Sequence, residues 1–340
     1  MTKSRLSEKR SCLIAAISVS MALGFAGCMK PDKPAESSGG DKTGVATTGG
    51  TTAGKHFRVG FAQANSKDPY RQVQNAALKE AAKSYPDITL DIQDAADNNE
   101  TQINQVETFI NEKIDLLLIS PNEAAPLTPV VEKVFDAKIP VVLMERGINS
   151  EKYTAWLGGD NRDIGKQAGE YLIKASGGTG KIVEIMGKAG ATPTNDRHQG
   201  FSDAIAKSAG LKVVDSYNCN YQREPAQTYM ENVLQKHTDF NIIYAHNDEM
   251  ALGAIKALKA AGKDPSKYII IGIDGVQEEV VKAIQAGEMS ATFEYNWLGK
   301  EALDTAHKIL TGSTVERKLK LPTVLVTKAN AADYLAHLPH

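Results

Sequence analysis

Cysteine is scarce in this chain. Three cysteines occur among 340 residues, and two of them, Cys12 and Cys28, lie near the N-terminus. One cysteine is left for the rest of the chain, which excludes an intrachain disulfide framework and a zinc site built on cysteine. We expect Cys219 to be a buried small residue rather than a reactive thiol.

An excess of basic residues and the common catalytic motifs are also lacking. The formal net charge is −2, so the basic footprint of a nucleic-acid-binding protein is missing. Gly177-Gly-Thr-Gly-Lys181 fails the spacing of a phosphate loop, and neither a Gly-x-Ser-x-Gly elbow nor a His-Glu-x-x-His pair occurs. We therefore expect no enzyme, no cofactor and no metal site. His198 and His246 are expected to have structural or polar roles.

The N-terminus carries an apolar run with the features of an export signal. Leu13–Ala26 follows a basic segment and is too short to span a bilayer comfortably. It leads into Leu23-Gly-Phe-Ala-Gly-Cys28, which resembles a bacterial lipobox, although Phe25 replaces the usual aliphatic residue. The resemblance implies cleavage before Cys28 and lipidation of that residue. The alternative is an ordinary signal peptide cut nearby, and both interpretations take the protein out of the cytoplasm.

The segment after the signal has the composition of a linker. Met29–Lys55 is rich in Gly, Ser, Thr, Lys and Pro and has no apolar period. We therefore assign residues 1–27 to the signal peptide and 28–55 to a lipidated flexible tether. A coil of this length reaches on the order of 30 Å.

The remaining chain alternates between apolar runs of strand length and amphipathic helical patterns. In the first half, strands are predicted at Phe57–Gln63, Ile88–Gln93, Asp115–Ile119 and Pro140–Met144. The second half repeats the alternation and ends in a predicted strand at Leu321–Val326. Near-continuous apolar strands separated by helices predict parallel sheets covered on both faces. The sequence thus predicts two α/β lobes with a cleft between them.

One predicted strand runs directly into a helix within Tyr244–Leu258. Asn247 lies at the turn between them, and ligands of open α/β sheets bind beyond the carboxyl ends of the strands. Its amide can both donate to and accept from neighbouring hydroxyl groups. The alternative is that Asn247 or Asp248 only caps the helix.

Charged planar side chains and tyrosines recur at the other strand ends. They include Asp68-Pro-Tyr-Arg71, Glu145, Arg146, Arg197, Tyr221 and Asp274. Carboxylates and guanidinium groups form paired hydrogen bonds, and an aromatic face can cover the C–H side of a sugar ring. The set therefore indicates a small ligand that is rich in hydroxyl groups.

Three motifs closely resemble those of the ribose/galactose type of periplasmic sugar-binding protein. They are Arg197-His-Gln-Gly-Phe201, Tyr244-Ala-His-Asn-Asp-Glu-Met-Ala-Leu-Gly-Ala and Gly272-Ile-Asp-Gly275, and the resemblance covers residues 56–330. The pair Tyr70-Arg71 and the Tyr-Ala-His-Asn-Asp run look most like galactofuranose-binding members. Ribose-type members have two aromatic residues where this chain has Tyr70 and Arg71.

The resemblance implies a set of ligand contacts. They are Tyr70, Arg71, Glu145, Arg146, Arg197, Tyr221, Asn247 and Asp274. Glu145 stands at a position usually held by Asp, and its longer side chain changes which hydroxyl group it can reach. Tyr295 falls where a Gln near the hinge is often found.

The resemblance also implies a type I periplasmic binding protein fold. This fold has two Rossmann-like lobes, each a parallel sheet flanked by helices, joined by three crossings. They are expected near Asp160-Asn161, Tyr295-Asn296 and Lys320-Leu321-Pro322. The N-terminal lobe then comprises residues 56–160 plus 296–321, and the C-terminal lobe 161–295 plus 322–340.

The function that the resemblance implies is capture of a monosaccharide, such as galactofuranose, for the permease of an ABC sugar importer. The protein is then an extracytoplasmic, lipid-anchored monomer with no nucleic-acid partner. One alternative is a sugar receptor for a membrane sensor. Another is an acidic sugar as ligand, which the three arginines would suit. Glu145 and Asp274 oppose an anion and favour a neutral sugar.

Overall fold

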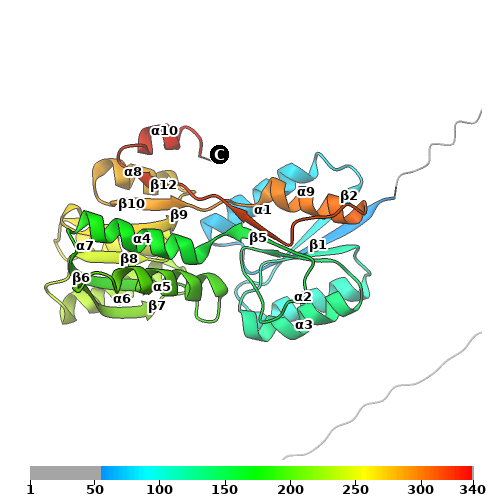
Figure 1. Cartoon of the computed structure of the whole chain (residues 1–340), viewed down its shortest axis with the longest axis horizontal. Coiled ribbons are helices and arrows are strands. Elements are labelled where there is room, and N and C mark those ends of the chain that lie inside the picture. The colour runs from blue at the N-terminus through cyan, green and yellow to red at the C-terminus, as the bar shows by residue number, and fades with distance from the viewer. Residues whose placement is uncertain (1–54, 339–340) are drawn as a thin grey trace, which may run out of the picture. The chain divides into compact units, whose positions relative to one another are not determined.

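A computed structural model describes residues 55–338. Two six-stranded sheets form its framework, each covered by helices on both faces (Figure 1). The predicted two-lobed α/β architecture is confirmed. None of the helices in the described part of the chain is long and apolar enough to cross a membrane. Cys28, with the signal and tether predicted around it, lies outside the described residues.

The first sheet has the strand order β11-β5-β4-β3-β1-β2, and all its neighbours are parallel. Its strands are β1 (Phe57–Gln63), β2 (Ile88–Asp94), β3 (Leu116–Ile119), β4 (Val141–Met144), β5 (Ala155–Gly159) and β11 (Lys318–Leu321). Helices α1 (Pro69–Ala82) and α9 (Gly299–Leu310) pack on one face, and α2 (Asn99–Asn111) and α3 (Ala124–Asp136) on the other. The short β3 and β4 are buried along their whole length, as expected for central parallel strands.

The second sheet has the order β12-β10-β9-β8-β6-β7. Its strands are β6 (Thr179–Met186), β7 (Gly210–Asn218), β8 (Ile242–Ala245), β9 (Ile269–Asp274), β10 (Ala291–Glu294) and β12 (Leu325–Thr327). One face carries α4 (Asn161–Ala175) and α5 (Thr192–Ile205), and the other α6 (Arg223–Lys236), α7 (Asp248–Ala260), α8 (Glu278–Ala286) and α10 (Ala331–Leu335). Strand β12 is antiparallel to β10, so the second sheet departs from the expected all-parallel pattern at one edge.

The described chain passes between the two sheets three times. It leaves β5 for α4, returns from β10 to α9, and passes from β11 to β12. Lys320 of β11 forms an ion pair of 2.6 Å with Asp160, so the first and last crossings are tied together.

Two details of the predicted strands were wrong. The expected strand Leu321–Val326 is two strands, β11 and β12, which belong to different sheets. Pro322 lies between them, and a proline lacks the N–H that a continuous strand would need. Strand β5 was not predicted, because Ala155-Trp-Leu-Gly-Gly159 ends in two glycines and contains no β-branched residue.

Glycines allow α4 and α5 to touch backbone to backbone. A Cβ atom at Gly165 would lie 2.1 Å from the carbonyl oxygen of Arg197, and one at Gly200 would lie 1.9 Å from that of Arg162. No side chain fits at either contact, and the close approach fixes the position of α5. Because Arg197 is on α5, this packing also positions a predicted ligand contact.

Replacing Gly200 by alanine should therefore force the two helices apart. We expect Gly200→Ala to lower the free energy of unfolding by about 1–3 kcal/mol, the usual cost of overpacking a core. Urea unfolding would measure the loss. The matched control is Gly147→Ala, because a Cβ there meets its nearest neighbour, Thr192 Cγ2, at an ordinary 3.5 Å. Equal stability of the two variants would contradict this account of the helix contact.

Candidate functional site

The eight predicted contacts line one cavity between the two lobes. Asp68, Pro193 and Tyr295 complete its lining. From the first lobe, Tyr70 and Arg71 lie in the first turn of α1, and Glu145 and Arg146 follow β4. From the second lobe, Arg197 is on α5. The ends of β7, β8 and β9 bring Tyr221, Asn247 and Asp274. The carboxyl ends of strands in both sheets thus face the same space, which is where open α/β sheets bind ligands.

The cavity is tight in this conformation. The centre of a water-sized sphere can occupy about 20 Å³ of it, which corresponds to about one water molecule. Nearly all of the lining side chains are buried. A ligand the size of a monosaccharide therefore requires the lobes to separate or the side chains to turn.

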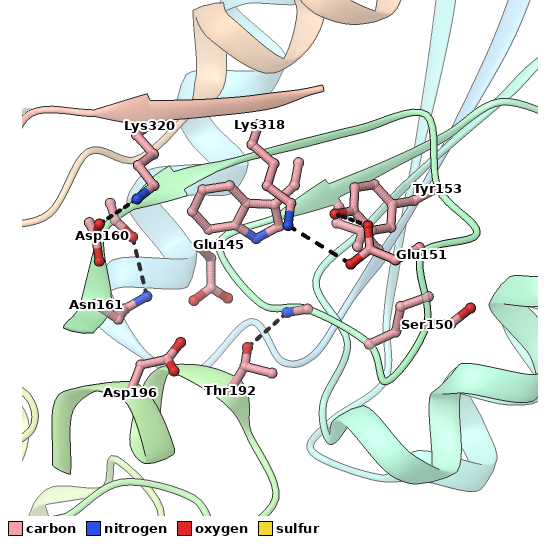
Figure 2. Close-up of a pocket in the computed structure, with 15 residues that line it drawn as sticks. Glu145, Ser150, Glu151, Tyr153, Asp160, Asn161, Thr192, Asp196, Lys318 and Lys320 are labelled. Carbon is pink, nitrogen blue, oxygen red and sulfur yellow. Dashed lines mark hydrogen bonds and ion pairs between the residues drawn. The ribbon is translucent and has the colours of Figure 1, made fainter. Parts of the chain in front are cut away.

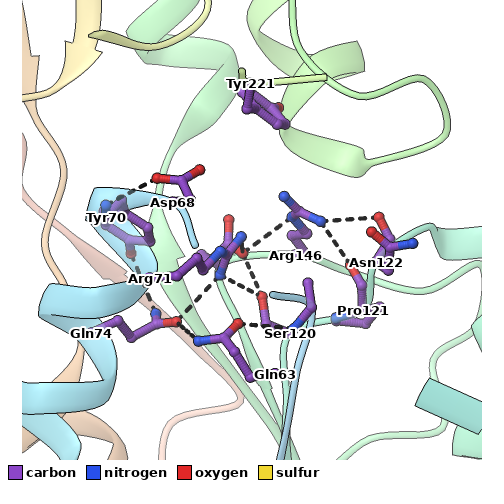
Figure 3. Close-up of polar contacts among 12 residues, drawn as sticks. Gln63, Asp68, Tyr70, Arg71, Gln74, Ser120, Pro121, Asn122, Arg146 and Tyr221 are labelled. Atoms are coloured by element: carbon purple, nitrogen blue, oxygen red, sulfur yellow. Dashed lines mark hydrogen bonds and ion pairs between the residues drawn. The ribbon is translucent and has the colours of Figure 1, made fainter. Parts of the chain in front are cut away.

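A network of charges forms the first-lobe side of the cavity (Figure 3). The guanidinium of Arg71 donates to Glu145 Oε1 at 2.5 Å, and the hydroxyl of Ser120 donates to the same oxygen at 2.5 Å. Arg71 also donates to Ser120 Oγ at 2.8 Å. Burial alone would raise the pKa of Glu145, but the positive charges of Arg71 and Arg146 outweigh it, so the pKa is lowered. Glu145 is therefore a carboxylate acceptor at neutral pH.

Arg146 connects this network to the opposite lobe. Its guanidinium donates to the carbonyl oxygen of Asn122 at 3.0 Å and lies 5.6 Å from the ring centre of Tyr221. Figure 3 shows Tyr221 across the cavity from the two arginines. Gly187 makes room for this ring, since a Cβ there would lie 2.1 Å from Tyr221 Cζ.

Arg197 is the main cation of the second-lobe side. Its Nε donates to Asn161 Oδ1 at 2.8 Å, and its NH1 donates to the carbonyl oxygen of His246. The guanidinium also lies 5.1 Å from the ring centre of Tyr295. These contacts hold the side chain in one orientation.

Asn247 both caps a helix and lines the cavity. Its Oδ1 accepts from the backbone N–H of Met250 at 3.0 Å, which is the N-cap bond of α7. Its Nδ2 donates to the carbonyl oxygen of Tyr221 at 3.1 Å. An amide has two N–H donors and two acceptor lone pairs, so one of each remains for a ligand. Capping and ligand contact are therefore compatible at this residue.

Asp68 lines the cavity but was not predicted as a contact. Its carboxylate accepts from the N–H of Tyr70 at 3.0 Å and caps α1. Asp68 belongs to the polar set at the strand ends, but an Asp before the Pro of a helix start is an ordinary cap, and the resemblance placed no ligand contact on it. Burial raises the pKa of Asp68 to about 6. Burial, with a further contribution from Asp68, also raises the pKa of Asp274 well above its usual value.

The two histidines near the cavity bind a buried glutamate. His198 Nδ1 lies 2.9 Å from Glu184 Oε1, and His246 Nε2 lies 3.0 Å from the same oxygen. Within residues 55–338, no group of three or more His, Cys, Asp or Glu side chains is arranged to hold a metal ion. Cys219 is buried, and burial raises the pKa of its thiol to about 12, as an inert small residue requires.

A second pocket lies beside the crossings (Figure 2). It admits a water-sized sphere over about 270 Å³ and shares Glu145 with the central cavity. Within it, the N–H of Gly147 donates to Thr192 Oγ1 at 2.8 Å. The N–H of Ala124 similarly donates to the carbonyl oxygen of Gly190 at 3.0 Å. These two hydrogen bonds join the lobes outside the central cavity.

The raised pKa of Asp68 predicts a stability change with pH. The pKa of Asp68 is about 6 in the folded protein, and its ordinary value is 3.8. The contribution of Asp68 to the free energy of unfolding is therefore fully present below pH 3.8 and is lost as the pH rises through 6. Asp68→Asn keeps the helix cap and stays neutral. We expect the stability of this variant relative to wild type to increase between about pH 4.5 and about pH 7, measured by urea unfolding.

Asp264→Asn is the matched control. Asp264 is likewise a helix cap, but it is exposed, and its hydrogen bonds with Ser266 lower its pKa. We therefore expect Asp264→Asn to gain no stability relative to wild type at neutral pH. A pH-independent difference between Asp68→Asn and wild type would show that Asp68 titrates normally.

Comparison with known proteins adds independent information to this geometry. The model of the periplasmic binding protein domain family matches residues 59–314. The galactofuranose-binding protein YtfQ of Escherichia coli strain K12 is 35% identical over 274 residues, which are 77% of this chain and 85% of that protein. The ribose import binding protein RbsB of Bacillus subtilis strain 168 is 30% identical over 81% of this chain and 88% of its own length.

A solved structure shows the same arrangement of lobes. The fructose-binding periplasmic domain of a hybrid two-component system superposes with a TM-score of 0.80 at 37% identity. The match covers 83% of this chain and 94% of that domain. The family model spans most of both lobes, and the structural match covers 83% of the chain. The chain therefore belongs to the periplasmic binding protein family and has the type I fold of that family.

Proposed function

We propose that this protein captures a neutral monosaccharide between its lobes and delivers it to an ABC sugar importer. The main observation in support of this proposal is the cavity between the lobes. Charged side chains of both signs and tyrosines from both lobes line it. Hydroxyl groups both donate and accept, so they can satisfy arginines and carboxylates at once. The chain's similarity to a ribose import binding protein supports the transport role.

The charge balance favours a neutral ligand over an acidic one. Three arginines and three carboxyl groups line the cavity, namely Arg71, Arg146, Arg197, Asp68, Glu145 and Asp274. Arg71 already neutralises Glu145 through a buried ion pair. Burial raises the pKa values of Asp68 and Asp274. A sugar hydroxyl can bond to either carboxyl group in both protonation states, whereas a ligand carboxylate repels whichever of them is ionised. Galactofuranose is the favoured sugar, on the similarity to the galactofuranose-binding protein.

The lobes are proposed to move as two bodies about the three crossings. We place the boundaries at residues 56–160 plus 296–321 for one lobe and 161–295 plus 322–340 for the other. The tight cavity and the two hydrogen bonds from Gly147 and Ala124 support this proposal, since opening would have to break both.

A binding role agrees with the relatives, which are binding proteins rather than enzymes. We propose that the protein acts as a monomer without catalysis. The alternative partner is a membrane sensor rather than a permease, because the fructose-binding relative is a domain of a two-component system.

Membership of the family indicates an extracytoplasmic location. Attachment to the membrane through Cys28 is a further proposal that rests on the N-terminal sequence.

Sugar binding should depend strongly on Asp274. Its loss removes a carboxyl partner of the ligand hydroxyls, and leaving a buried hydrogen-bonding group without its partner costs about 1–3 kcal/mol. Asp274→Ala should therefore weaken binding by roughly 10–100-fold. Calorimetry with D-galactose, D-ribose, D-fructose, D-galacturonate and ribose 5-phosphate would measure the effect.

Asp333→Ala is the matched control, since Asp333 is an exposed carboxylate in the same lobe. Tight binding of galacturonate or the sugar phosphate, made tighter by Asp274→Ala, would overturn the neutral-sugar proposal. Failure of every sugar to bind the wild-type protein would overturn the proposed function itself.

Membrane attachment should depend on Cys28. Cys28→Ala removes the thiol that the lipobox-like sequence offers for lipidation, so the protein should appear in the soluble extracytoplasmic fraction. Immunoblots of membrane and soluble fractions would show the change. Cys12→Ala, a cysteine substitution within the signal, serves as the control. If Cys28→Ala stays as membrane-bound as wild type, another anchor is responsible.

A further inference from the structure

Asp274 carries its carboxyl group into the cavity on a strained backbone. Its φ angle is +127°, a region that residues other than glycine rarely occupy. Such a conformation persists only when the surrounding contacts hold it. The carbonyl oxygen of Asp274 accepts from the N–H of Tyr295 at 3.0 Å, and that of Gly275 accepts from the hydroxyl of Tyr334 at 2.9 Å.

Asp248 makes a further contact with the turn formed by Asp274 and Gly275. Its Oδ2 accepts from the N–H of Gly275 at 2.7 Å, and its Oδ1 accepts from the hydroxyl of Thr292 at 2.7 Å. The side chain is fully buried and does not line the cavity. Both carboxylate oxygens are therefore used inside the second lobe, next to the site but outside it.

The second lobe accommodates this carboxylate at a cost. Asp248 forms no ion pair with a basic side chain in the described chain, and burial raises its pKa to about 7. Asn247 already supplies the helix cap of α7, so capping does not explain why an aspartate stands at position 248. Strand β9 also leaves space for it, since a Cβ at Gly272 would lie 2.2 Å from Asp248 Oδ1.

The position of Asp248 in the chain links two parts of the site. It directly follows Asn247 at the end of β8, and it holds the residue directly after Asp274 at the end of β9. We propose that Asp248 is a positioning residue, which fixes Asp274 for ligand binding without contacting the ligand. This inference rests on the proposed sugar-binding function.

The test is a double-mutant cycle with D-galactose, D-ribose and D-fructose as calorimetric probes. Asp248→Ala should weaken binding by about 10-fold in the wild-type background, the loss of roughly one hydrogen bond. Because the effect acts through Asp274, the same substitution should change binding by less than about 2-fold in an Asp274→Ala background. An equal loss in both backgrounds, or no loss in either, would overturn the proposal.

Two further variants separate positioning from general stability. Asp248→Asn should stay within about 3-fold of wild type, because its amide can accept from Gly275 and donate to Thr292. Thr292→Val leaves Asp248 in place but frees one of its oxygens, so it should weaken binding even if Asp248→Ala fails to fold. Glu249→Gln, in the same helical turn, is the control, since Glu249 pairs with Arg223 instead and does not line the cavity.

Amide exchange provides a readout that needs no ligand. The Gly275 N–H should be strongly protected from hydrogen exchange in wild type and Asp248→Asn, and exposed in Asp248→Ala. It should be less protected in Thr292→Val, where Asp248 keeps its bond to Gly275 but loses the bond that orients its side chain. Unchanged protection in those last two variants would overturn the role of Asp248 at this turn. If wild type binds none of the sugars, the proposed function fails, while the exchange experiment still decides whether Asp248 holds the turn.

Discussion

The buried ion pair between Arg71 and Glu145 is the interaction on which the first-lobe side of the cavity depends. Both side chains are almost completely buried, and Ser120 bonds to both partners. Removing one partner would leave an unpaired buried charge, which typically costs about 3–5 kcal/mol. The backbone of Glu145 is itself in the left-handed region, with φ +53°, and its N–H donates to Leu157 of β5. The pair therefore joins α1, β3, β4 and β5 at one point.

The same arrangement determines how this cavity can select a ligand. In the tight conformation, its polar residues bond to one another, as Arg71 does with Glu145 and Asn247 with Tyr221. A ligand has to offer groups that match the donors and acceptors exposed on opening, because an unmatched buried group costs free energy. Selectivity in such a site comes as much from rejecting molecules that leave a charge unpaired as from attracting the right one.

Much of this arrangement could be predicted from sequence, for identifiable reasons. Asn247 follows β8 and caps α7, and Arg197 lies within α5, the helix after β6; parallel strands bring such positions to one edge. Asp68 was noted among the polar residues at the strand ends but not as a ligand contact, because its sequence context is that of an ordinary helix cap. Asp248 is marked by no local pattern, since its partners Gly275 and Thr292 lie far along the chain. Strand β5 was not predicted because its sequence contains no β-branched residue.

The three crossings have a consequence for the order in which the molecule can assemble. The first sheet gains its edge strand from Lys318–Leu321, which pairs with Trp156–Gly159, and one of its faces is covered by α9. The lobe that begins with β1 is thus completed by α9 and β11, which follow β6 to β10 of the other sheet in the chain. Pairing between such distant segments slows folding. A growing chain cannot close its first lobe before β11 has been made, and the apolar core of that lobe stays incomplete until then.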